Sequence, residues 1–222
     1  MLGARLQGVI FDVDGTLLDS MPMWDHAASR YLEGLGVTPE PELQQILFPM
    51  SLTKAAEYLR EHYRLNMTVP EIMDGFNATI HAFYRDEALP KAGAEELLAG
   101  LRREGIPMTV ATSTDRCHIE AAFARLGWTQ YFEELLTCTE VGVGKVQPLI
   151  YQLAAEHMGT PVGSTWVFED ALHAAETAHR AGFPVAGVYD RASEANQERL
   201  RETAELYMKE LWTAERFMEE IG

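Results

Sequence analysis

Two carboxylates follow a short apolar run near the start of the chain and are well placed to do chemistry. The run Gly8–Phe11 contains two β-branched residues, and Asp12 and Asp14 follow it. We therefore expect a buried strand here, with both carboxylates on the same side of the backbone because side chains alternate along a strand. Gly15 then permits a sharp turn. Open α/β sheets bind ligands at the carboxyl ends of their strands.

Paired acids in this position suit phosphoryl transfer. A carboxylate beside a bound Mg²⁺ can act as a nucleophile, because the metal screens its repulsion from an incoming phosphate. A second carboxylate can give a proton to the leaving group and later take one from water. A bare Asp-x-Asp is more often an acidic, solvated turn, so the interpretation depends on the longer string around it.

That string, Phe-Asp-Val-Asp-Gly-Thr-Leu-Leu-Asp-Ser over residues 11–20, resembles the first motif of the haloacid dehalogenase-like (HAD) hydrolase superfamily. The resemblance implies that Asp12 attacks phosphorus and forms an aspartyl-phosphate, and that Asp14 is the general acid and base. It also implies that Thr16 supports Asp14 and the turn by hydrogen bonding.

Two further stretches match phosphate-binding motifs of the family. Val110–Thr114 ends a predicted strand with hydroxyl side chains, and the resemblance makes Thr112 the phosphate-binding hydroxyl and Ser113 the donor of a backbone N–H. Lys145 matches the family's lysine, whose charge would neutralise the nucleophile and the phosphate.

The stretch around this lysine departs from the family's common Lys-Pro-x-Pro-Asp. The chain keeps Lys145 and Pro148 but has Val146 and Leu149 at the other two places. The chain therefore retains the lysine of the motif but lacks the motif's aspartate, which would support the loop. A lone lysine is usually solvated surface, so this assignment depends on its spacing from the other motifs.

A fourth motif, Glu169 and Asp170 after a predicted buried strand, completes the expected metal site. An isolated Glu-Asp pair often only caps a helix. By the family match, Asp12 and Asp170 bind Mg²⁺ through their side chains and Asp14 through its backbone carbonyl. Glu169 either binds the metal directly or contacts a residue that does. Carboxylate oxygens are the ligands that Mg²⁺ prefers.

The elements that must position these residues alternate along the second part of the chain. Apolar runs predict strands at 107–112, 135–138, 165–168, 184–189 and 206–211. Helical patterns predict helices at 92–103, 118–126, 148–158, 171–180 and 194–204, several of them ended by glycine. This alternation predicts an α/β fold with a doubly wound, mostly parallel, Rossmann-like sheet.

Residues 20–87 instead carry consecutive helical patterns and no convincing strand. Ser51 can cap one of these helices, and Pro70 suits the first turn of another. We therefore expect an α/β core formed by residues 1–19 and 88–222, with 20–87 as an inserted helical cap. This layout resembles HAD enzymes with a small helical cap, the group that includes β-phosphoglucomutase and phosphoglycolate phosphatase. Such an insert could close over the acids and exclude water.

The cap sequence favours hydrolysis over phosphoryl transfer within one substrate. Members similar to β-phosphoglucomutase carry a His shortly after the first motif and an Arg in a cap loop. In our alignment Trp24 stands at the His position, Phe48–Leu52 forms the loop, and the nearest basic residue is Lys54. The loop's apolar character predicts a substrate with little charge beyond its phosphate.

Composition narrows the classes of partner. The formal net charge of -16 opposes binding to nucleic acid or anionic membranes. Two cysteines do not indicate a disulfide framework, and we see neither a signal peptide nor an apolar run of transmembrane length, so we expect a cytoplasmic protein. We expect a monomer or weak homodimer.

Taken together, these features predict Mg²⁺-dependent hydrolysis of a small phosphate ester through an aspartyl-phosphate. A phosphomutase would share all four motifs and differ in the cap. A dehalogenase is disfavoured, because that branch lacks the Asp14-type acid and the metal. A non-catalytic binding protein would have lost Asp12 or the acids of the fourth motif, and this chain retains them.

Overall fold

The computed structural model describes residues 6–47 and 50–222, which form two compact units. One unit contains the chain up to Ser20 together with Ala88–Gly222, and the other is Met21–Glu87. We call them the core unit and the cap unit. In the described part of the chain, every helix is too short or too polar to span a bilayer.

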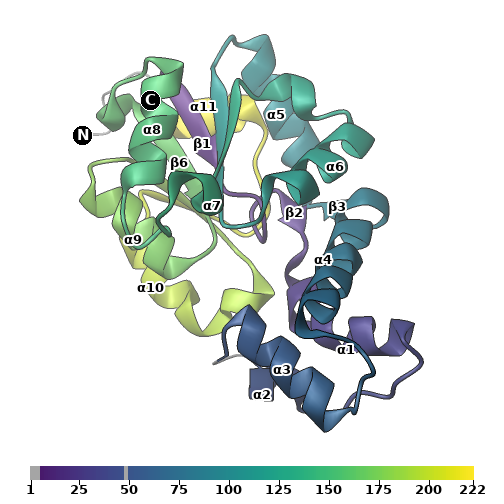
Figure 1. The fold of residues 1–222 in the computed structure, drawn as a ribbon. Coiled ribbons are helices and arrows are strands. Elements are labelled where there is room, and N and C mark those ends of the chain that lie inside the picture. Colours follow the sequence, from purple (N-terminus) through teal and green to yellow (C-terminus); the bar gives the residue numbers. More distant parts are fainter. Residues whose placement is uncertain (1–5, 48–49) are drawn as a thin grey trace. The chain divides into compact units, whose positions relative to one another are not determined.

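The core unit is built on a sheet of six parallel strands in the order β5-β4-β1-β6-β7-β8 (Figure 1). The strands are β1 (Gly8–Phe11), β4 (Met108–Thr112), β5 (Glu134–Thr137), β6 (Thr165–Glu169), β7 (Val185–Val188) and β8 (Leu206–Met208). The chain adds β4 and β5 on one side of β1, and then β6, β7 and β8 on the other. Ligands bind at such a reversal of strand order, beside the carboxyl ends of the strands. The predicted fold class is confirmed.

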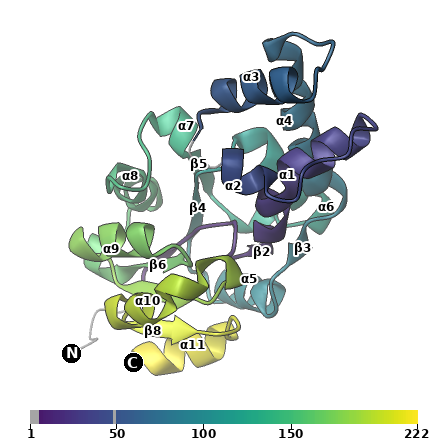
Figure 2. The same ribbon diagram turned by 90° about the horizontal axis from the view of Figure 1, so that it is seen from below.

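Helices cover both faces of this sheet (Figure 2). They are α5 (Ala94–Arg103), α6 (Arg116–Leu126), α8 (Leu149–Met158), α9 (Leu172–Arg180), α10 (Gln197–Thr203) and α11 (Ala214–Ile221). Strand alternation sends Ile10 into the apolar cluster beneath α8, α9 and α10. Phe11 faces the other side, where its ring lies 4.8 Å from that of Phe168, which in turn packs on Phe217 of α11.

Short elements connect these layers. They are β2 (Leu18–Asp19), β3 (Leu89–Pro90), α7 (Cys138–Val141) and the 3₁₀ turns at Thr129–Tyr131, Val162–Ser164 and Arg191–Asn196. Strands β2 and β3 pair antiparallel in a separate two-stranded sheet within the core unit.

Two predicted boundaries are wrong by three residues, and several others are wrong by one or two. The last strand ends at Met208 and not at 211, because the N–H of Leu211 donates to the backbone oxygen of Ala92. The helix predicted at 194–204 begins at Gln197. It is preceded by a 3₁₀ turn that Asp190 caps by accepting from the N–H of Ala192 at 2.9 Å.

The described residues of the cap unit form four helices and no strand. They are α1 (Met21–Gly34), α2 (Leu43–Leu47), α3 (Leu52–His62) and α4 (Val69–Asp86). Ser51 caps α3 as predicted, its hydroxyl accepting from the N–H of Lys54 at 3.3 Å. Thr68 and Glu71 form a reciprocal capping box on α4, and Pro70 lies in its first turn.

Helices α1 and α4 approach closely at Gly75. A Cβ built there would lie 2.6 Å from the ring of Tyr31, which is buried and packs edge-on against Phe76. The absence of a side chain on α4 therefore makes room for the aromatic ring on α1.

We predict that Gly75→Ala destabilises the cap unit by roughly 1–2 kcal/mol, because the overpacking cost exceeds the gain in helix propensity. Gly34→Ala is the matched control, since a Cβ there meets nothing within 4 Å. We expect that control to be neutral or slightly stabilising. Urea unfolding of both variants provides the measurement, and equal stability of the two would contradict the packing argument.

Candidate active site

Three carboxylates meet where β1 and β6 end. Phe11 pairs with Phe168 across these strands, and the N–H of Asp12 donates to the backbone oxygen of Phe168 at 3.0 Å. This register brings Asp12 next to Glu169 and Asp170. One oxygen from each of the three carboxylates lies within 4.8 Å of the others, and all three residues are buried.

A single lysine enters this cluster. Lys145 is 5% exposed, and its Nζ donates to Oδ1 of Asp12 and, at 2.5 Å, to Oε1 of Glu169. The hydroxyl of Tyr151 also donates to Oε1 of Glu169 at 3.0 Å, and the N–H of Ala171 donates to Oε2 at 3.1 Å. Both oxygens of Glu169 therefore accept hydrogen bonds from the protein. Glu169 therefore contacts the lysine through one oxygen and Ala171, the N-cap residue of helix α9, through the other.

The cluster holds more negative than positive charge, and this shifts the pKa values of its members. Burial raises the pKa of Asp12 from 3.8 to about 7; Lys145 opposes this shift, while Glu169 and Asp14 add to it. Burial, followed by repulsion from Asp12 and Glu169, also raises the pKa of Asp170 well above its ordinary value. Burial alone would lower the pKa of Lys145, but Asp12 and Glu169 raise it well above its usual range, so this lysine stays charged. Three acids around one ammonium group form a site suited to a further cation.

Two hydroxyls hold the carboxylate of Asp14. Ser20 donates to Oδ1 at 2.6 Å and Thr114 donates to Oδ2 at 2.7 Å. The prediction that Thr16 supports Asp14 is wrong, because its hydroxyl donates to Oδ1 of Asp170 at 3.4 Å. Thr16 does support the turn, where its backbone N–H donates to the oxygen of Val13 at 3.2 Å.

The predicted phosphate-binding hydroxyls lie at the end of β4. This strand neighbours β1 with Val110 opposite Phe11, so the carboxyl ends of the two strands share one edge of the sheet. Thr112 is buried and accepts from the N–H of Thr114 at 3.1 Å, which links it through Thr114 to Asp14. Ser113 is exposed, and its hydroxyl lies 3.6 Å from the sulfur of Cys138.

Gly15 brings the turn after β1 against the metal-binding candidates. Its φ of +87° is in the left-handed region, and a Cβ there would lie 2.6 Å from Oδ2 of Asp170. A side chain would displace that carboxylate and strain the backbone.

We predict that Asp12→Asn stabilises the metal-free protein at high pH. Asp12 holds its proton more tightly in the folded state than in the unfolded chain, so ionising it costs folding free energy as the pH rises from 3.8 to about 7. About three pKa units correspond to roughly 4 kcal/mol, which is the upper bound of the gain at pH 8. The gain should shrink by pH 5.

Thermal unfolding in chelator at both pH values measures this difference. Asp19→Asn, the same substitution at an exposed side chain of the first motif, is the control and should change little at either pH. Parallel pH dependence in wild type and Asp12→Asn would rule out the electrostatic account.

Comparisons with known proteins agree on one family. A family model described as a haloacid dehalogenase-like hydrolase matches residues 6–182. The chain is 30% identical to validoxylamine A 7'-phosphate phosphatase of Streptomyces hygroscopicus subsp. limoneus over 183 residues, covering 81% of this chain and 84% of the relative. It is also 30% identical to hexitol phosphatase A of Escherichia coli (strain K12) over 171 residues, covering 75% and 76%.

A solved structure has the same fold. The β-phosphoglucomutase of Clostridium difficile superposes with a TM-score of 0.69, covering 98% of this chain and 97% of that chain, at 15% identity. The resemblance inferred from the four motifs is confirmed, and the chain belongs to the haloacid dehalogenase-like hydrolase family.

Proposed function

We propose that this protein is a phosphatase that uses Mg²⁺ to hydrolyse a small phosphorylated metabolite through an aspartyl-phosphate. The observation that carries the proposal is the buried cluster of Asp12, Glu169 and Asp170, with the charge of Lys145 inside it. A phosphate dianion can approach a carboxylate only where positive charge offsets the repulsion. The two relatives described above, both named as phosphatases, support a phosphate ester as substrate.

The donor set fits Mg²⁺, a hard cation that binds carboxylate and carbonyl oxygens. The side chains of Asp12 and Asp170 and the backbone carbonyl of Asp14 would hold the ion. Glu169 would either join them or fix their orientation. When bound, Mg²⁺ would offset the charge of the phosphate and lower the pKa of the nearby carboxylates, which burial has raised.

The chain's own residues then divide the reaction into two steps. A carboxylate oxygen of Asp12 forms a bond to phosphorus as the bond to the ester oxygen breaks, and protonated Asp14 gives its proton to the leaving oxygen. Asp14, now ionised, takes a proton from water, whose oxygen displaces Asp12 and releases inorganic phosphate. Thr112, the N–H of Ser113 and Lys145 would hold the oxygens of the phosphoryl group.

A phosphomutase would need two further groups in the cap, a base and a basic residue that holds a second phosphate. At the position where a base is expected, the indole N–H of Trp24 donates to the hydroxyl of Tyr84 at 3.0 Å. An indole has a donor but no acceptor, so Trp24 cannot serve as a base. The loop expected to carry a basic clamp includes Phe48 and Pro49, which lie outside the described residues. Trp24 therefore favours hydrolysis.

We predict that the protein releases inorganic phosphate from a panel of phosphorylated metabolites with Mg²⁺ and not with chelator. Asp12→Asn should lower kcat roughly a thousandfold or more, because it removes the nucleophile. Asp19→Asn should retain wild-type turnover. A phosphate-release assay across the panel measures all three.

Glucose 1-phosphate belongs in that panel because its product separates the two reactions. Release of phosphate and glucose supports hydrolysis, whereas formation of glucose 6-phosphate would replace the proposal with a mutase. Folded protein that turns over no ester with Mg²⁺ present would refute both.

We also predict that Thr114→Val lowers kcat about tenfold with a smaller change in KM, because one hydrogen bond that orients Asp14 is lost. Thr109→Val in β4 is the matched control. The hydroxyl of Thr109 is buried and has no hydrogen-bond partner among the described residues, so its removal should leave kcat unchanged and stability unchanged or higher. Equal kcat in the two variants would show that Thr114 does not act on Asp14.

A further inference from the structure

The position of Lys145 is fixed at its ammonium group and not along its loop. Gly144, Val146 and Gln147 around it are exposed, although the lysine itself is buried. Leu149, at the place of the motif's aspartate, is 38% exposed, and helix α8 begins without a side-chain cap. The location of the ammonium group therefore depends on the side chains that it contacts.

One neighbour of this ammonium group, Tyr151, has no part in the two reaction steps described above. It lies in the first turn of α8 and is fully buried. Its hydroxyl donates to Oε1 of Glu169 at 3.0 Å, and the centre of its ring lies 6.0 Å from Nζ of Lys145. Burial, followed by repulsion from Glu169, raises the pKa of Tyr151 well above its ordinary value, so the hydroxyl keeps its proton and remains a donor.

Tyr151 and Lys145 donate to the same atom. Oε1 of Glu169 accepts from Nζ at 2.5 Å and from the Tyr151 hydroxyl at 3.0 Å, while Oε2 accepts from the N–H of Ala171. A carboxylate oxygen has about two lone-pair sites, so these two donors fill Oε1. A hydrogen bond to a carboxylate stabilises its negative charge. Oε1 therefore attracts the ammonium group less strongly than it would with the lysine as its only donor.

This competition decides how Lys145 distributes its protons. An ammonium group has three donors. One is directed at Asp12 and another at Glu169, which leaves the third for an oxygen of the phosphate. Without the hydroxyl of Tyr151, the ammonium group would be drawn toward Glu169 and away from Asp12, because charges attract strongly in a buried site.

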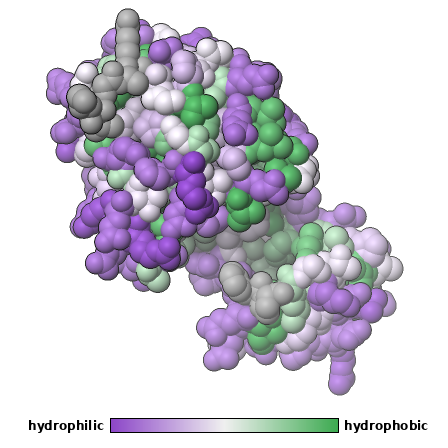
Figure 3. Space-filling model, turned by 90° about the vertical axis from the view of Figure 1, so that its left-hand side faces the viewer, coloured by the Kyte–Doolittle hydropathy of each residue, from purple (hydrophilic) through white to green (hydrophobic). Residues whose placement is uncertain are grey.

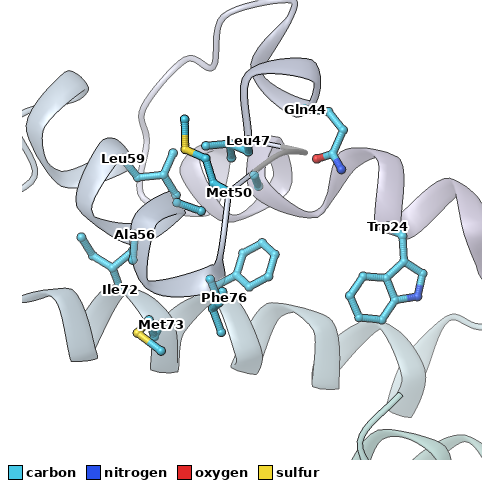
Figure 4. Close-up of a pocket in the computed structure, with 12 residues that line it drawn as sticks. Trp24, Gln44, Leu47, Met50, Ala56, Leu59, Ile72, Met73 and Phe76 are labelled. Carbon is cyan, nitrogen blue, oxygen red and sulfur yellow. The ribbon is translucent and has the colours of Figure 1, made fainter. Parts of the chain in front are cut away.

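The charge of Lys145 has no buried substitute. Hydrophilic side chains, in purple, cover much of the face shown in Figure 3, and the formal net charge of -16 repels an approaching phosphate. Among the residues that the structure describes, Lys145 is the only buried lysine or arginine. The described side chains around the pocket inside the cap unit carry no charge, among them Met50, Leu59 and Phe76 (Figure 4). A shift of Lys145 away from Asp12 would therefore weaken phosphate binding directly.

We propose that Tyr151 is a positioning residue for phosphate binding, an inference that rests on the phosphatase function proposed above. Its hydroxyl shares Oε1 of Glu169 with Lys145 and thereby keeps the ammonium group available to Asp12 and to the phosphate. Tyr151 acts on the phosphate only through Glu169 and Lys145.

The effect on the lysine can be tested without catalysis. The protein has four lysines, so ¹⁵N labelling at Nζ gives four side-chain signals, and Lys145→Met identifies the one from Lys145 by its loss. In chelator, Tyr151→Phe should shift this signal, because it removes the hydroxyl and keeps the ring. Tyr207→Phe is the matched control in the core unit, since it removes a hydroxyl that donates to Gln197 at 2.7 Å. It should leave the Lys145 signal in place.

Phosphate binding tests the proposed role. With Mg²⁺ present, Tyr151→Phe should raise the KM of an ester that the wild type hydrolyses, and the Kd of inorganic phosphate, by about tenfold, the scale of one hydrogen bond to a charged group. Lys145 would contact the phosphate both before and during transfer, so kcat should change by less than about twofold. Tyr207→Phe should change none of these constants. Unchanged KM and Kd in Tyr151→Phe would overturn the proposal.

Glu169→Gln shows whether Tyr151 acts through the carboxylate. Adding Tyr151→Phe to Glu169→Gln should raise the Kd of inorganic phosphate by less than about twofold, because the shared charged acceptor is already absent. If Tyr151 served only to pack helix α8, its substitution would raise Kd equally with and without Glu169. That result would also overturn the proposal.

The outcomes separate this role from the proposed function. If the wild type hydrolyses no ester, the phosphatase function fails, while the Kd of inorganic phosphate in the same variants still decides the role of Tyr151. A wild type that neither hydrolyses an ester nor binds phosphate refutes both. If esters are hydrolysed but Tyr151→Phe shifts neither the Lys145 signal nor KM, the role of Tyr151 alone is refuted.

Discussion

The site depends on one buried cation, the ammonium group of Lys145, held between two carboxylates. Carboxylates removed from water oppose folding unless an opposite charge and hydrogen bonds compensate them. Lys145 supplies that charge to Asp12 and Glu169, and Tyr151 and the N–H of Ala171 complete the hydrogen bonding of Glu169. The parallel register of β1 and β6 permits this arrangement, because it brings Asp12 beside the strand that ends in Glu169.

One lysine does not balance three acids, and the residual negative charge is what a divalent cation would neutralise. The pKa values of Asp12 and Asp170 are raised because both carboxylates are buried with more negative than positive charge around them. The fold therefore keeps groups that destabilise it in the metal-free state, a cost that sites of chemistry commonly carry. Gly15 also serves the site at the expense of conformational freedom, because its missing side chain lets the turn lie against Asp170.

Apolar runs alternating with helical patterns were sufficient to predict the α/β fold, and the resemblance to the family's motifs identified Asp12, Lys145 and Asp170, which the structure brings together. The partners of Asp14 could not be found in this way. Thr114 lies 100 positions from Asp14, and its hydrogen bond depends on the register of β4 against β1 and on one side-chain rotamer. Thr16 was a reasonable candidate by proximity along the chain, but the turn at Gly15 directs its hydroxyl to Asp170.

The two units are stabilised by different kinds of interaction. Charged groups need fixed partners, and the ends of hydrogen-bonded strands hold Asp12 and Glu169 in one geometry. The helices of the cap unit are instead held together by apolar contacts without directed bonds, among them those of Leu32, Leu59 and Ile72. Substitutions among those apolar side chains therefore change the stability of the cap unit and leave the hydrogen bonds at the strand ends of the core unit intact.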